Sequence, residues 1–177
     1  MKTLNHIKQL ILLLALLFPI SAAAQKSPVD KLFEKYANKE GMTTVNISGA
    51  LLGFASKIQE DSPESEFLSG LKGVRILSVE DEQLNKTLNF YEELERDGFF
   101  KNHDYEVLME VTEKNEVVRF FGRNAGEGKF SELLLVIGGD ENTLISIRGM
   151  IAPENIAKIT SALDIDLSIN TKNKIVD

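Results

Sequence analysis

The sequence predicts an α+β fold, with a mainly antiparallel sheet that ends in a four-stranded meander and with helices packed on one face. Two observations lead to this prediction. In several segments before residue 98, apolar residues recur at the three- and four-residue spacing of an amphipathic helix. After residue 104, β-branched and aromatic runs follow one another with only short polar breaks, which is typical of strands joined by hairpins.

The first 24 residues have the features of an export signal. Lys2 and Lys8 supply a positive start, Leu10–Ile20 is apolar, and Ala22 and Ala24 place small residues where a signal peptidase reads them. The apolar run is shorter than the ~20 residues that span a bilayer. We therefore expect cleavage after Ala24 and no membrane-spanning segment in the mature chain, with an uncleaved anchor as the alternative.

The chain contains no cysteine. This excludes a disulfide framework, a thiolate metal site and a thiol nucleophile. It also excludes lipid attachment at a processed N-terminus. We therefore expect a periplasmic or secreted protein that is not a lipoprotein.

We expect one α+β domain over residues 25–163. Ser27 and Pro28 cap and open its first helix, and Gly41 closes it. Four apolar residues share one face of this helix: Val29, Leu32, Phe33 and Tyr36. Thr43–Ser48 then alternates as a strand, and Gly49–Ile58 follows as a second helix.

The middle of the chain combines a short helix, a strand and a long helix. A helical turn begins at Ser62-Pro63 and carries Phe67, Leu68 and Leu71, and Gly73–Val79 is predicted to be a strand. Glu80–Asp97 has the strongest helical pattern. Its apolar stripe consists of Leu84, Leu88, Tyr91 and Leu94.

The remaining residues predict the meander, a final helix and a tail. The four strands are Tyr105–Thr112, Glu116–Gly122, Phe130–Ile137 and Thr143–Arg148. The hairpin connections between them are Lys114-Asn115, Asn124–Lys129 and Gly138–Glu141. A helix is expected over Pro153–Leu163, and residues 164–177 are expected to form at most a short edge strand before the chain frays.

The connection Gly138–Glu141 reads GGDE and repeats four of the five residues of the GGDEF motif of bacterial diguanylate cyclases. In those enzymes the aspartate helps to hold a metal on a nucleotide triphosphate, and Asp97–Lys101 with Asp104 also resembles an upstream segment of that family. However, Asn142 replaces the phenylalanine of the motif, and the nucleotide-binding G-H-x-x-G-D segment is absent. Glycine and aspartate also suit tight turns, because glycine tolerates positive φ and aspartate bonds to nearby backbone. We interpret the segment as a hairpin turn.

No complete catalytic or metal-binding set is present, so we predict no catalytic, cofactor-binding or metal-binding residues and no enzymatic activity. His103 is the single histidine left after the signal is removed, which is too few for a histidine-rich zinc site. Gly122–Gly128 lacks the G-K-[ST] ending of a phosphate loop, and Asp164 with Asp166 lacks the rest of a calcium loop. Carboxylates are plentiful, at Glu60, Asp61, Glu92, Glu93, Glu95 and Asp97. They would support glycosidase chemistry only as a pair within a cleft.

Charge excludes one class of partner. Removing Lys2 and Lys8 leaves 18 basic residues against 27 acidic ones, a net charge of −9. An acidic surface repels phosphate backbones and anionic lipid headgroups. We therefore expect no nucleic-acid partner.

Two segments carry a family resemblance. They are VDKLFEKYANKEGMTTVNISGALLGFA (Val29–Ala55) and FSELLLVIGGDENTLISIRGMIAPENIAKI (Phe130–Ile159). Their order resembles that of the exported domain-of-unknown-function 4252 family of Gram-negative bacteria, in which an early K-Y-…-G-x-T-x-V-x-I-S segment precedes a late E-L-L-L-x-x-G…L-I-x-I-x-G segment. The resemblance implies architecture and export without an active site. Because members are often encoded beside sigma and anti-sigma factors, it also implies a link to envelope signalling.

The expected function is a non-enzymatic envelope protein that binds an unknown protein or a small hydrophobic ligand. Two alternatives stay open. A lipid or hydrophobic-ligand carrier would need an open apolar cavity between sheet and helices. A carboxylate-dependent hydrolase would need a pocket that holds two acidic side chains.

Overall fold

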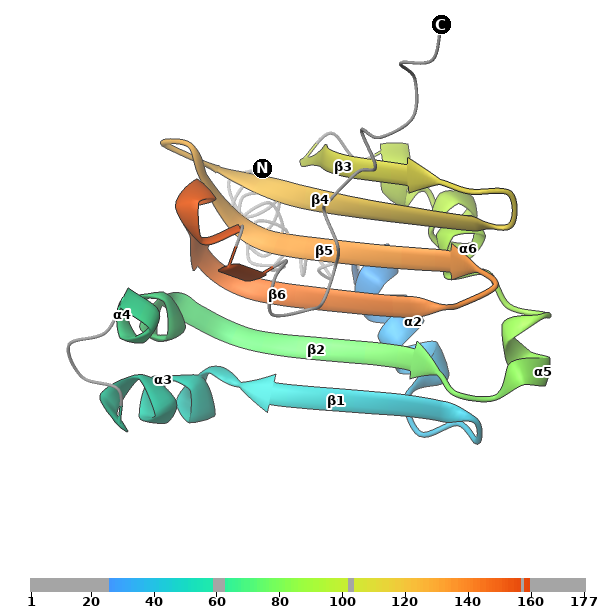
Figure 1. Ribbon diagram of the computed structural model, residues 1–177, viewed down its shortest axis with the longest axis horizontal. Helices are drawn as coiled ribbons and strands as arrows, with labels where there is room; N and C mark the ends of the chain where they lie inside the picture. The colour runs from blue at the N-terminus through green and yellow to red at the C-terminus, as the bar shows by residue number, and fades with distance from the viewer. Residues whose placement is uncertain (1–25, 59–62, 102–103, 157, 160–177) are drawn as a thin grey trace, which may run out of the picture.

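The protein is built around one six-stranded antiparallel sheet (Figure 1). The computed structural model describes residues 26–58, 63–101, 104–156, 158 and 159. The strands are β1 (Met42–Ser48), β2 (Leu71–Val79), β3 (Tyr105–Thr112), β4 (Glu116–Gly126), β5 (Lys129–Gly139) and β6 (Thr143–Ile151). Their order in the sheet is β1-β2-β6-β5-β4-β3, so β3 to β6 form the predicted four-stranded meander. The α+β class and the antiparallel sheet are thus confirmed.

Helices lie behind one face of this sheet and at both of its ends (Figure 1). The helices are α2 (Pro28–Tyr36), α3 (Gly49–Ile58), α4 (Pro63–Gly70), α5 (Glu82–Asn85) and α6 (Phe90–Arg96). Two short 3-10 turns are η1 (Phe99–Lys101) and η2 (Pro153–Asn155). Figure 1 shows α2 and α6 behind the sheet, whereas α3 and α4 lie at the end where β1 finishes and β2 begins.

Hydrophobic clusters form on both faces of the sheet, because successive side chains of a strand point to opposite sides. On the helix-covered face, Leu134 and Val136 of β5 pack with Phe33 of α2 and Phe90 of α6. On the opposite face, which we call the front face, alternate strand residues pack with side chains of α3 and α4. This front cluster includes Leu133, Leu135, Ile145, Ile147, Leu52, Phe67 and Leu68.

The first helix has the N-terminal cap and the buried apolar face that the sequence predicts. The backbone N–H of Asp30 donates to Ser27 Oγ at 3.1 Å, which caps the helix, and Pro28 occupies the first turn. Val29, Leu32, Phe33 and Tyr36 are all buried on one face of α2. The predicted closure of this helix at Gly41 is wrong, because the helix ends at Tyr36 with Ala37 as its C-cap, and Gly41, with a φ of +76°, lies in the connection to β1.

The predicted helix Glu80–Asp97 is wrong as a continuous element. The segment is divided into α5 and α6, with Lys86–Asn89 between them. Asn89 caps α6 by accepting a hydrogen bond from the N–H of Glu92 at 3.1 Å. The break has a second cause in Asn142, described below.

Smaller differences concern the ends of elements. Leu71, expected on a helical turn, is the first residue of β2. Asn124–Lys129 was expected to be a hairpin loop, but β4 runs to Gly126 and β5 begins at Lys129. Only Glu127 and Gly128 lie between these strands, and both have positive φ. The final helix begins with η2, Ile156 is helical, and the predicted remainder beyond Ile159 lies outside the described residues.

Candidate functional site

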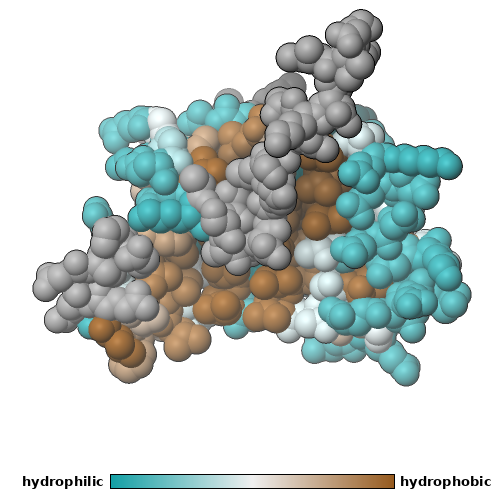
Figure 2. All heavy atoms as spheres, viewed as in Figure 1, coloured by the Kyte–Doolittle hydropathy of each residue, from teal (hydrophilic) through white to brown (hydrophobic). Residues whose placement is uncertain are grey.

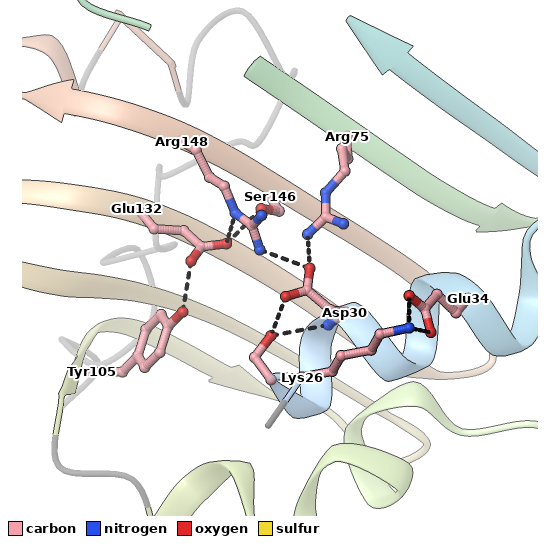
Figure 3. Close-up of polar contacts among 9 residues, drawn as sticks. Lys26, Asp30, Glu34, Arg75, Tyr105, Glu132, Ser146 and Arg148 are labelled. Atoms are coloured by element: carbon pink, nitrogen blue, oxygen red, sulfur yellow. Dashed lines mark hydrogen bonds and ion pairs between the residues drawn. The ribbon is translucent and has the colours of Figure 1, made fainter. Parts of the chain in front are cut away.

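A network of charged side chains joins the N-terminus of α2 to the middle of the sheet (Figure 3). Asp30, in the first turn of α2, accepts hydrogen bonds at one carboxylate oxygen from Arg75 of β2 at 2.7 Å and from Arg148 of β6 at 2.8 Å. The Ser27 hydroxyl donates to its other oxygen at 2.9 Å. One carboxylate therefore holds two strands and a helix together.

The network continues into β5 through Glu132, of which only 3% is exposed. Its carboxylate accepts hydrogen bonds from Ser146 Oγ at 2.5 Å, from Arg148 Nε at 3.2 Å and from the Tyr105 hydroxyl at 2.7 Å. A buried carboxylate is costly unless it is paired and hydrogen-bonded, and both conditions are met here. Arg148 therefore bridges the two carboxylates of the network.

The surroundings hold these groups in one protonation state. Burial opposes ionisation of Asp30, but hydrogen bonds from Arg75, Ser27 and Arg148 outweigh it and hold the pKa of Asp30 below its ordinary value. Burial and the negative charge of Glu132 raise the pKa of Tyr105 well above its ordinary value. Burial disfavours the charge of Arg148, yet Glu132 and Asp30 keep its pKa raised. Near neutral pH, Asp30 and Arg148 are therefore charged, and Tyr105 is neutral.

This network anchors α2 to the sheet. Each carboxylate is engaged by arginine or hydroxyl groups from more than one element, which fixes its position. Sequence reasoning did not identify these residues as a group. The one available signal was Glu132 itself, a charged residue inside the otherwise apolar run of β5.

The GGDE segment was expected to be the connection between β5 and β6, but Gly138 and Gly139 are the last two residues of β5, and Asp140, Glu141 and Asn142 form the connection. Gly139 has a φ of +131°, and a Cβ atom there would lie 1.9 Å from the carbonyl oxygen of Asn115. The N–H of Asp140 donates to the same carbonyl at 3.1 Å. No group of three metal-binding side chains occurs among the residues that the structure describes. The segment is thus packed against the β3–β4 hairpin.

Asn142, the residue at the phenylalanine position of the cyclase motif, is buried and 1% exposed. Its side-chain oxygen accepts from the N–H of Phe90 at 2.8 Å. Its amide nitrogen donates to the carbonyls of Leu88 at 3.1 Å and Gly139 at 3.2 Å, and to Asn85 Oδ1 at 3.1 Å. By bonding to the carbonyl of Leu88 within the break and to the N–H of Phe90 at the start of α6, Asn142 stabilises the separation of α5 from α6.

A hollow of about 830 Å³ lies beside this turn. Its lining includes five carboxylates, from Glu82, Glu92, Glu93, Asp140 and Glu141. Glu93 is engaged by Lys35 at 2.6 Å and by the Tyr36 hydroxyl. No aromatic side chain is among its lining residues. Two other hollows, of about 490 and 350 Å³, are also lined mainly by polar residues.

Helix α3 exposes three large apolar side chains to solvent. Leu51, Phe54 and Ile58, spaced along one side of the helix, are 57%, 62% and 70% exposed. The buried residues of the same helix are Leu52 and Ser56. We call Leu51, Phe54 and Ile58 the α3 stripe. In Figure 2, hydrophobic residues are visible over α3 and over the front face of β1 and β2.

Three of the carboxylates singled out in the sequence lie beside hollows. Glu92 and Glu93 of α6 line the acidic hollow, and Asp97 lines a hollow of about 100 Å³ that Glu93 also borders. His103, Glu60, Asp61, Asp164 and Asp166 lie outside the described residues.

Comparison with known proteins supports one assignment. Residues 36–159, more than half of the chain, match the family described as domain of unknown function (DUF4252). The chain therefore belongs to this family, as its two quoted segments indicated. No curated protein and no solved structure matches it. Within the described residues, no helix is long and apolar enough to cross a membrane.

Proposed function

We propose that this member of the DUF4252 family is an exported, non-enzymatic interaction module that binds another envelope protein through the α3 stripe. The observation that carries the proposal is the exposure of three large apolar side chains along one side of α3. Leu51, Phe54 and Ile58 are more than half exposed, while Leu52 and Ser56 of the same helix are buried. An exposed apolar row of this kind is typical of a surface that another molecule covers.

Burial of the α3 stripe would contribute favourably to the free energy of binding. Burying one large apolar side chain contributes about 1.5–3 kcal/mol, so covering Leu51, Phe54 and Ile58 would contribute several kcal/mol to binding. A helix presenting residues at this spacing fits an apolar groove or a second helix. Because the mature chain carries a net charge of −9, the partner is expected to surround its apolar contact with neutral or basic residues.

Export places this surface in the periplasm or outside the cell. The proposal rests on Lys2 and Lys8 before the apolar run Leu10–Ile20, and on the small residues Ala22 and Ala24. Cleavage after Ala24 would release a chain without a lipid attachment site. A link to envelope signalling is part of the same proposal, and its support is family membership alone.

The two alternatives have weaker support. A carrier of lipid would hold its ligand in an apolar cavity, whereas the hollow of about 830 Å³ beside Asp140 and Glu141 is lined mainly by polar side chains. A hydrolase is favoured only by the acidic hollow, and there Glu93 is already bound by Lys35. Each alternative has a distinct outcome in the experiment below.

A photo-crosslinking amino acid at position 54 tests the proposal in intact cells. Phe54 is 62% exposed, so the replacement should not disturb folding. Val107, which is 52% exposed on β3, provides a matched position on another surface. We expect one discrete protein adduct from position 54, none from position 107, and loss of the adduct when Leu51 and Ile58 are changed to serine.

Other outcomes would decide against the proposal. Equal adducts from positions 54 and 107, or an adduct that survives the serine changes, would show that the α3 stripe is not a specific surface. Native mass spectrometry of the protein purified from the envelope would reveal a carrier by a co-purifying lipid mass. Turnover of a glycoside substrate that is lost in the Glu92→Gln variant would instead favour the hydrolase.

A further inference from the structure

The two edge strands of the sheet differ in how they are protected. β3, at one edge, carries Glu106 and Glu110, and its register with β4 is interrupted between Val107 and Met109. Charged side chains and bulges are the usual means by which proteins prevent an edge strand from pairing with another chain. β3 is therefore unsuited to intermolecular pairing.

β1, at the opposite edge, has neither form of protection. Its sequence, MTTVNIS, contains no charged residue and no proline. It pairs with β2 without interruption from Met42 to Ser48. In Figure 1 no described element lies along its outer side. The outward backbone groups of β1 are thus a template for another strand.

We propose that β1 pairs in antiparallel fashion with β1 of a second copy, about a two-fold axis at Val45. This register aligns all seven residues of each strand. It joins the two sheets into one continuous sheet with an isologous interface, in which the same residues contribute from both copies. The surface is separate from the α3 stripe, so the inference goes beyond the proposed function.

The side chains of β1 are complementary to themselves in this register. Val45 lies opposite its own copy, Thr43 lies opposite Ile47, and Thr44 lies opposite Asn46. The Val45–Val45 pair and the Thr43–Ile47 pairs lie on the front face. There Ile47 packs against the front cluster, and Val45 is 38% exposed. Thr44 and Asn46 can exchange hydrogen bonds on the other face. No like charges oppose each other, and this self-complementarity favours a second copy over a strand of another protein.

Sedimentation analysis of the chain starting at Gln25 tests the pairing. We expect a reversible dimer whose association strengthens with salt, because the copies repel each other through a net charge of −9. Val45→Lys places two ammonium groups opposite each other and should weaken association at least tenfold. Val107→Lys, on the other edge strand, should leave it unchanged. A monomer at every concentration, or a dimer unaffected by Val45→Lys, would overturn the proposal.

Cysteine crosslinking tests the register without relying on the lysine variant. The chain contains no cysteine, so introduced thiols react without background. Opposite residues of an antiparallel pair have Cβ atoms about 4.5–5.5 Å apart, close enough for a disulfide after small adjustment. On mild oxidation, Val45→Cys should form a covalent dimer, and Thr43→Cys mixed with Ile47→Cys should crosslink faster than either alone. Crosslinking of Val45→Cys no faster than that of Val107→Cys would contradict the pairing.

Discussion

At the residue scale, the buried amide of Asn142 is one of two causes of the break between α5 and α6, beside the cap at Asn89. Asn142 lies between β5 and β6, yet its side chain bonds to Asn85, Leu88 and Phe90, more than 50 positions earlier in the chain. These bonds satisfy backbone groups that the division of the helix leaves free. The polar side chain can be buried because both its oxygen and its nitrogen have partners.

Replacing Asn142 should therefore be costly. Asn142→Ala leaves the N–H of Phe90 and the carbonyl of Leu88 buried without this partner, and we expect a loss of about 3 kcal/mol in the free energy of unfolding. Asp140→Ala, two residues away in the same turn, should cost less than about 1 kcal/mol. Urea denaturation of both variants measures the difference, and equal losses would refute the role assigned to Asn142.

The anchoring network should make stability depend on pH in a defined direction. Folding lowers the pKa of Asp30 below its ordinary value of 3.8, so its carboxylate stabilises the fold above that pH. This contribution is lost as the pH falls through the lowered pKa. Asp30→Asn should cost about 2 kcal/mol at pH 7, because two arginines lose their shared anion. The difference from the unsubstituted chain should shrink below pH 3.8.

The exposed pair Lys26–Glu34 supplies the control for that prediction. Both side chains are more than half exposed, and such pairs contribute about 0–1 kcal/mol. Glu34→Gln should therefore change stability little between pH 3 and pH 7. Denaturation curves at several pH values give the free energy of unfolding of the Asp30→Asn and Glu34→Gln variants for comparison. If Asp30→Asn were as mild as Glu34→Gln, the network would not anchor α2.

At the element scale, α3 is the helix whose orientation most directly concerns function. Leu52, which is 9% exposed, packs in the front cluster, whereas Phe54 on the same helix contacts solvent. We expect Leu52→Ser to cost about 2–4 kcal/mol and Phe54→Ser less than about 1 kcal/mol. Leucine is a better helix former than phenylalanine, but this separates the two changes by only a few tenths of a kcal/mol. A large loss from Phe54→Ser would mean that the stripe supports the fold rather than binding.

Elements defined by neighbouring residues could be predicted from the sequence. The cap at Ser27 and the strand over Thr43–Ser48 are local signals, and the structure has both, although burial does not alternate along β1. The break between α5 and α6 could not be predicted in the same way, because one of its causes lies more than 50 residues away in Asn142. Local helical periodicity carries no information about such a distant hydrogen bond.

The candidate sites were predictable only in part, for the same reason. The sequence indicated that the GGDE segment is a turn, which holds for Asp140 and Glu141, whereas the two glycines belong to β5. The pairing of Glu132 with Arg148 depends on the register between β5 and β6, which the sequence does not specify by itself. Likewise, the apolar pattern of α3 predicts a helix, but the burial of Leu52 rather than Phe54 depends on how the helix meets β2.

At the scale of the whole molecule, binding of an envelope protein requires the acidic domain to leave the cytoplasm after its signal is removed. Intact-mass measurement of the exported protein should give a chain beginning at Gln25, because Ala22 and Ala24 satisfy the small-residue rule. A mature species that retains residues 1–24 would establish the anchored alternative. The α3 stripe would then have to act at the membrane surface.

The central claim is that a partner covers the α3 stripe in the cell, and thiol labelling tests it most directly. Because the chain has no cysteine, Phe54→Cys and Val107→Cys each introduce one reactive group at a similarly exposed position. In the purified protein, a membrane-impermeant maleimide should label both variants at similar rates. In intact cells we predict labelling of Phe54→Cys at least tenfold slower than that of Val107→Cys. Equal labelling rates in cells would contradict the claim.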